Sequence, residues 1–153
     1  MIHLSIPSVP PSINHMYMTI VKGKGKQKML LRALTKEGRR YKNETRAYLA
    51  QNYQSALVRF EKHQPYLIFV RFHFVGMFTK GWPEKAKSRY KKLDVTNHLK
   101  AFEDVLSDVT GVDDSHNHCV IAHKVDDVEP FTNVWAWNMQ KEVTPFNELL
   151  FRL

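Results

Sequence analysis

The chain has 153 residues, 43% of them hydrophobic, and a formal net charge of +8. This length predicts one domain spanning residues 1–153, and the chain lacks the run of about 20 apolar residues that a membrane span requires. A basic chain favours polyanionic partners, and we expect nucleic acid rather than a membrane, because no basic amphipathic helix with a large aromatic face is present.

Short strands open the predicted fold. Residues 2–6 predict a strand, which the prolines at 7, 10 and 11 end. A second extended segment is predicted at residues 17–21. The run from Lys22 to Lys28, KGKGKQK, then predicts a basic loop, because two glycines and four lysines cannot form a core element. Its lysines are candidate DNA contacts: Lys22, Lys24, Lys26 and Lys28.

A helical pattern covers residues 35–62, with Thr35 as its expected N-cap. Cations crowd its first turns, where they oppose the helix dipole. A phosphate partner would explain them, and a solvated basic face is the alternative. These cations are Arg39, Arg40, Lys42 and Arg46.

The second half of the chain alternates strands and a helix. Aromatic and β-branched residues at 66–76 predict a long strand, and residues 77–92 predict a basic loop with one acid, Glu84. The cations of that loop are further candidate DNA contacts: Lys80, Lys85, Lys87, Arg89, Lys91 and Lys92. A helix at 96–109, a turn at 112–114 and strands at 119–125 and 132–138 follow, and we expect the two strands to pair as a hairpin through residues 126–130.

These elements predict an α+β fold, with a mixed, partly antiparallel sheet and a few helices packed on it. The tail at 143–153 predicts a short helix or an interface arm. Trp135 and Trp137 alternate along one strand, which indicates a core or dimer-interface position.

The helix at 96–109 has an apolar face and, opposite it, a polar face at spacings of three and four. Asn97, Lys100, Asp104 and Asp108 form that polar face. Spacing alone is compatible with a solvated face, including a Lys100–Asp104 ion pair, with Asp94 or Thr96 as the N-cap.

Three observations favour a metal site instead. Asp94 follows a basic run directly, and the acidic pair Asp113 and Asp114 precedes a predicted strand. Hard cations such as Mg²⁺ choose carboxylate oxygens together with water and phosphate. Carboxylates within a basic chain therefore indicate an enzyme that holds a divalent metal against nucleic acid. His116, His118 and Cys119 suggest zinc as a less favoured alternative.

The order D-V-T-N-x-x-K-x-x-x-D from Asp94, followed by G-V-D-D-S, resembles the RusA family of Holliday junction resolvases. The opening Val9–Tyr17 is similar to that family's P-P-S-x-N-x-x-Y segment, and Leu34-Thr35 with Gly38 and Tyr41 resembles the segment before its long helix. The likeness covers most of residues 4–126.

The resemblance implies a homodimeric, Mg²⁺-dependent nuclease (Mn²⁺ is a possible substitute) that acts on four-way DNA in a bacterial or phage-infected cytoplasm. It implies catalytic roles for Asp94, Lys100 and Asp114, with supporting positions at Asn97, Asp104 and Asp113. We expect the metal ligands among Asp94, Asp104, Asp113 and Asp114, and no small-molecule cofactor.

One position departs from the family pattern. Thr96 stands where the family often has a second aspartate, and a hydroxyl is a poorer Mg²⁺ ligand than a carboxylate. Thr96 could ligate through water, Asp104 or Asp113 could supply the charge, or activity could be reduced. A catalytically silent junction-binding protein and a nuclease of looser specificity, acting on flaps or other branched DNA, are the alternatives.

Overall fold

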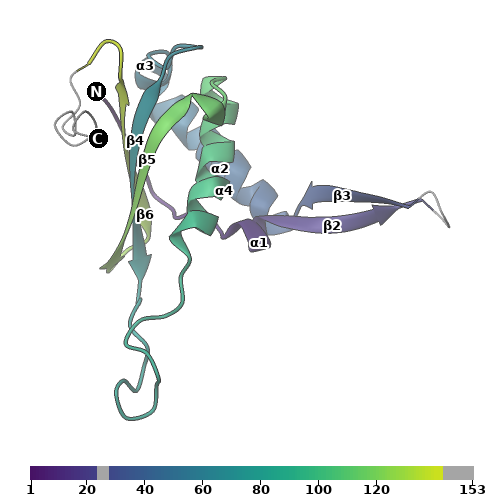
Figure 1. The fold of residues 1–153 in the computed structure, drawn as a ribbon, viewed down its shortest axis with the longest axis vertical. Coiled ribbons are helices and arrows are strands. Elements are labelled where there is room, and N and C mark those ends of the chain that lie inside the picture. The colour runs from purple at the N-terminus through teal and green to yellow at the C-terminus, as the bar shows by residue number, and fades with distance from the viewer. Residues whose placement is uncertain (24–27, 143–153) are drawn as a thin grey trace.

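The computed structural model describes residues 1–23 and 28–142. A four-stranded sheet in the order β1-β6-β4-β5 carries helices on one face (Figure 1). Its strands are β1 (Ile2–Ile6), β4 (Tyr66–Val75), β5 (Asn117–Asp127) and β6 (Phe131–Asn138). The β4–β5 pair is parallel and the other two pairs are antiparallel. The predicted α+β fold with a mixed, partly antiparallel sheet is therefore confirmed.

The helices in the described part of the chain are α1 (Ile13–Met16), α2 (Lys36–Asn52), α3 (Gln54–Leu57) and α4 (Val95–Thr110). Thr35 caps α2 as predicted, since its hydroxyl accepts a hydrogen bond from the Gly38 amide at 3.0 Å. Gly38 also lies against α1, where a Cβ would meet the Met16 carbonyl oxygen at 2.3 Å. Glycine at this position therefore allows the two helices to approach closely.

One face of β4 forms the centre of the core. Its alternate residues Tyr66, Ile68, Val70 and Phe72 are fully buried, and Phe102 of α4 packs among them. Each large apolar side chain buried in this way stabilises the fold by roughly 1.5–3 kcal/mol. The core therefore fixes α4, with its polar face directed away from the sheet.

The predicted helix at 35–62 is not continuous: it breaks at Tyr53, resumes as α3 and is not helical after Leu57. Tyr53 leaves the helical conformation, with φ −132° and ψ 21°, and its hydroxyl accepts a hydrogen bond from the Ser5 amide of β1 at 3.1 Å. This contact with a distant strand ends α2, while the apolar spacing continues into α3. Periodicity alone does not show the break.

The predicted hairpin between the last two strands is also wrong. β4 lies between them, with β5 parallel on one side and β6 antiparallel on the other. The two strands begin at Asn117 and Phe131, slightly earlier than predicted. Alternating side chains indicate that a segment is a strand, but they do not identify its partner. The long apolar strand β4 takes the central position, where β5 and β6 pair with its two edges.

A separate two-stranded ribbon projects from the body (Figure 1). It consists of β2 (Tyr17–Lys22), which was predicted, and β3 (Met29–Leu34), which was not, because MLLRAL shows no alternation. Lys22 is the last residue of β2 rather than part of a loop. Lys24 and Lys26 lie outside the described residues, as does the predicted tail element at 143–153.

Trp135 and Trp137 lie on the sheet face opposite the helices, paired across strands with Phe69 and Leu67. Trp137 is buried, at 8% exposed, and Trp135 stacks on His3 with ring centroids 5.0 Å apart. The prediction of a core position is confirmed for Trp137.

Candidate active site

Local signals define both ends of α4. Asp94 is the N-cap, and its carboxylate accepts hydrogen bonds from the Thr96 amide at 3.0 Å, the Thr96 hydroxyl at 2.6 Å and the Asn97 side-chain amide at 2.9 Å. Gly111 ends the helix with φ +67°, a left-handed conformation that glycine adopts most readily. These signals place the helix register, and with it the polar face.

Lys100 brings together two of the predicted carboxylates. Its ammonium group lies 3.3 Å from the Asp104 carboxylate, one turn along α4, and it also contacts the Asp114 carboxylate. Asp114 begins the short 3-10 turn η2 (Asp114–His116), and Asp113 caps that turn by accepting from the Ser115 amide at 2.9 Å. The turn at Gly111 therefore returns the acidic pair to the side of the helix.

Two other elements reach the same place. The Tyr17 hydroxyl of β2 donates to Asp104 at 2.8 Å, and Lys42 of α2 contacts the Asp108 carboxylate. Together with α4 and η2 they line an open surface pocket of about 370 Å³, which we call the acidic pocket. It is lined by Tyr17, Lys42, Lys100, Asp104, Ser107, Asp108, Asp113 and Asp114.

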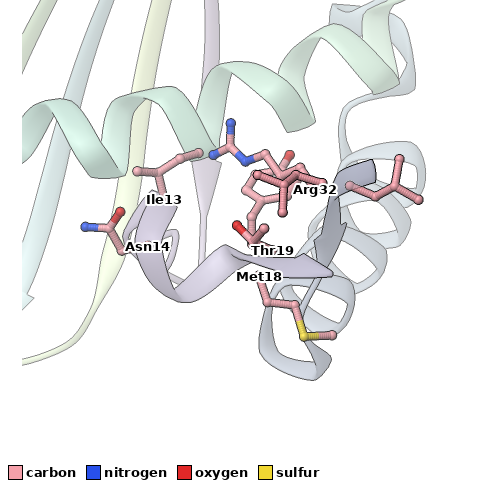
Figure 2. Close-up of a pocket in the computed structure, with 8 residues that line it drawn as sticks. Ile13, Asn14, Met18, Thr19 and Arg32 are labelled. Carbon is pink, nitrogen blue, oxygen red and sulfur yellow. The ribbon is translucent and has the colours of Figure 1, made fainter. Parts of the chain in front are cut away.

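A second cavity, of about 380 Å³, lies at the root of the ribbon (Figure 2). The Arg32 guanidinium carbon lies 4.1 Å from the Tyr17 ring centroid, and Arg32 shares a ribbon face with Thr19, while Met18 points to the other side. Asn14, from the opening segment of the family resemblance, also lines this cavity. Tyr17 therefore links the ribbon to the acidic pocket.

The hydrogen bonds of the site shift several pKa values. The hydrogen bond to Asp114 raises the pKa of Lys100; burial offsets part of this rise, and the contact with Asp104 adds to it. Hydrogen bonds from Thr96 lower the pKa of Asp94, and those from Ser115 lower the pKa of Asp113. Burial and then the bond to Asp104 raise the pKa of Tyr17 to about 12. Lys100, Asp94 and Asp113 are therefore charged at neutral pH, and Tyr17 is neutral.

The predicted residues thus fall into two groups. Lys100, Asp104, Asp113 and Asp114 line the acidic pocket, whereas Asp94 does not. Asp94 and Lys100 are six residues apart, which is about 9 Å along a helix axis. Thr96 and Asn97 both bond to Asp94, so they belong with it at the start of α4. The structure therefore does not bring Asp104 or Asp113 to Thr96.

Sequence reasoning did not assign five residues of this region to the site: Glu103, Tyr17, Lys42, Ser107 and Asp108. Glu103 is half-buried and accepts from the Asn117 side-chain amide at 3.1 Å, and burial raises its pKa. Its spacing of three from Lys100 could have indicated it. Tyr17 and Lys42 come from distant segments, and no local signal relates them to α4.

The donor chemistry of the site suits Mg²⁺, because all the candidate ligands are oxygens. Within residues 1–23 and 28–142, no group of three or more His, Cys, Asp or Glu side chains is arranged to hold a metal ion. Mg²⁺ commonly takes only one or two carboxylates, with waters and substrate phosphates completing its shell. The residues therefore fit a metal shared with substrate better than a closed protein cage.

The predicted DNA contacts lie on three elements. Lys22 is the last residue of β2, Lys28 directly precedes β3, and Arg39 and Arg40 are exposed in the first turns of α2. The third element is the loop between β4 and α4. Its predicted contacts are all in described residues: Lys80, Lys85, Lys87, Arg89, Lys91 and Lys92.

Fold and site together define a basic α+β protein with a lysine- and carboxylate-lined pocket beside α4. The family model for Endodeoxyribonuclease RusA matches residues 8–135, so the chain belongs to the RusA endodeoxyribonuclease family. The resemblance found in the motifs is thereby confirmed. No individual curated protein matches the chain. Among the described residues, no helix is long and apolar enough to cross a membrane.

Proposed function

We propose that this protein is a Mg²⁺-dependent endodeoxyribonuclease that resolves four-way DNA junctions by paired phosphodiester hydrolysis. The observation that carries the proposal is the Lys100 ammonium group between Asp104 and Asp114, within the motif that places the chain in its family. A generic solvated face has no need for a lysine held between carboxylates from two elements.

Asp94, at the start of α4, and Asp114, in the acidic pocket, are the proposed metal ligands, with Asp104 and Asp113 as further candidates. Because Asp94 and Asp114 belong to separate groups of residues, waters and substrate phosphates would supply the remaining ligands. When bound, Mg²⁺ would polarise the phosphodiester and lower the pKa of a bound water. Lys100 would stabilise the negative charge that develops on the phosphate or on the leaving oxygen. Asn97, like Thr96, orients the Asp94 carboxylate through its hydrogen bond.

The proposed assembly is a homodimer. A four-way junction is two-fold symmetric, and a dimer with the same symmetry presents one site to each of two matched strands. The cations of the ribbon, of α2 and of the loop before α4 would contact phosphates. Binding should then weaken steeply with added salt and depend little on base sequence. The expected location is the cytoplasm of a bacterial or phage-infected cell.

Thr96 favours a second candidate, a junction-binding protein without catalysis. Its hydroxyl donates to Asp94 at 2.6 Å, and it supplies no carboxylate of its own. Asp94→Asn and Asp114→Asn test the choice. Each variant should bind a labelled junction with unchanged affinity and lose cleavage. Cleavage by either variant at the wild-type rate would refute the ligand assignment, and junction binding without wild-type cleavage in Mg²⁺ or Mn²⁺ would favour the silent protein.

A further inference from the structure

The loop between β4 and α4, residues 77–92, exposes three large aromatic side chains. Phe78 is 45% exposed, Trp82 is 46% and Tyr90 is 48%. The loop extends beyond the end of the sheet (Figure 1). Single exposed hydrophobic residues are common, but three aromatic rings in one short segment indicate a binding surface. We call this segment the aromatic loop.

The aromatic loop has a defined conformation at its base. Phe78 and Tyr90 form an antiparallel bridge, with the Thr79 amide donating to the Arg89 carbonyl at 2.9 Å. The buried Met77 anchors the loop, since its amide donates to Asp126 at 2.7 Å and its carbonyl accepts from the Lys91 amide at 2.8 Å. The rings are therefore presented from a fixed turn.

The two paired rings form one surface. Their centroids are 5.1 Å apart with an interplanar angle of 36°, and the Arg89 guanidinium carbon lies 5.6 Å from each centroid. Trp82 lies further out, with its amide donating to the Thr79 carbonyl at 3.4 Å. Aromatic rings next to a guanidinium group are suited to stack on flat, electron-rich rings.

The charge of the loop indicates which kind of partner these three aromatic rings would contact. Its cations are Lys80, Lys85, Lys87, Arg89, Lys91 and Lys92, against one acid. Across residues 1–23 and 28–142, none of these cations has a carboxylate within 4.0 Å. A partner that offers both flat rings and a dense line of negative charge is nucleic acid with unpaired bases.

The aromatic loop is close to the candidate site in sequence, because it ends two residues before Asp94. The bases of an intact duplex are stacked on one another, and their faces are covered. Unpaired bases occur at branch points and in single strands. We propose that Phe78, Trp82 and Tyr90 stack on unpaired bases next to the strand to be cut, an inference that rests on the proposed function for its DNA substrate.

The test measures binding without metal. Fluorescence anisotropy in EDTA compares a labelled oligothymidine with a blunt duplex of equal length. Two variants are compared with the wild type: the single variant Trp82→Ala, and the double variant Phe78→Ala with Tyr90→Ala. Each should weaken single-strand binding by about 10-fold or more and duplex binding by less than about twofold. Trp82→Phe should retain affinity within about threefold while losing the tryptophan quenching that the oligothymidine causes in the wild type.

Lys85→Ala with Lys87→Ala is the matched control from the same loop. It should weaken binding of both DNAs and lower the dependence of affinity on salt. An equal loss for both DNAs in the aromatic variants, or no loss for either, would overturn the proposal. The proposal would also be overturned if Trp82→Ala dissociated a dimer in sedimentation, which would make the ring part of a subunit interface. It would likewise be overturned if the aromatic variants lost binding to anionic vesicles and kept their binding to DNA.

These readouts separate the two proposals. If the wild type cuts junctions but the aromatic variants bind single strands as well as it does, only the stacking proposal is refuted. If the protein binds single strands through these rings but does not cut junctions, only the proposed nuclease function is refuted.

Discussion

Replacing Lys100 with glutamine separates a catalytic pocket from a solvated polar face. The side chain of Lys100 is 48% exposed, and its ammonium contacts Asp114 and lies 3.3 Å from Asp104. Exposed ion pairs contribute roughly 0–1 kcal/mol each, because water screens them. Two pairs therefore stabilise the fold by at most about 2 kcal/mol, which corresponds to a fall in Tm of no more than about 8 °C.

The effect on cleavage should be much larger. Removing one group that stabilises developing charge typically lowers the rate by about 10²–10³. The assay is single-turnover cleavage of a labelled four-way junction in Mg²⁺, with thermal unfolding measured on the same preparations. Lys141→Gln is the control, because its ammonium lies 2.6 Å from Glu61 and its side chain is 56% exposed, outside the acidic pocket.

Cleavage by Lys100→Gln within threefold of wild type would show that Lys100 is a residue of a solvated face. An equal loss in Lys141→Gln would show that the effect does not come from the pocket.

Three further changes test the structure around the site. The pKa of Tyr17 is about 12 in the folded protein, against an ordinary value of 10.0. As the pH rises, the Tyr17 hydroxyl therefore loses its proton in the unfolded chain before it does so in the folded protein. The free energy of unfolding should then fall more steeply from pH 10 to 12 in wild type than in Tyr17→Phe, and equal slopes in urea titrations would contradict this. Gly38→Ala places a Cβ 2.3 Å from the Met16 carbonyl oxygen and should destabilise the protein by about 1–3 kcal/mol, so an unchanged denaturation midpoint would be the opposing result. Thr96→Asp should raise Mg²⁺ affinity in calorimetric titration, whereas an unchanged affinity and Mg²⁺ dependence of cleavage would place residue 96 away from the metal.

Local chemistry made α4 predictable. An aspartate at its start, a glycine after its end and an apolar stripe between them are all nearby in sequence, and so is the Lys100–Asp104 pair at a spacing of four. The return of Asp114 to Lys100 depends on one turn at Gly111, and the family resemblance had already grouped the two residues as catalytic.

Contacts between distant segments were not predictable in this way. The hydrogen bond from Tyr17 to Asp104 joins residues 87 apart, and β4 separates two strands that are adjacent in sequence. Alternation and helical spacing report which side chains share a face. They carry no information on which distant element covers that face, because that depends on the packing of the whole core.

Cleavage of a synthetic four-way junction tests the central claim most directly. With Mg²⁺, the account predicts paired nicks placed symmetrically across the branch point, no such nicks in EDTA, and little cleavage of a linear duplex of the same sequence. Binding of the junction without cleavage in either Mg²⁺ or Mn²⁺ would contradict the enzyme assignment. Cleavage of the linear duplex at an equal rate would contradict the junction specificity.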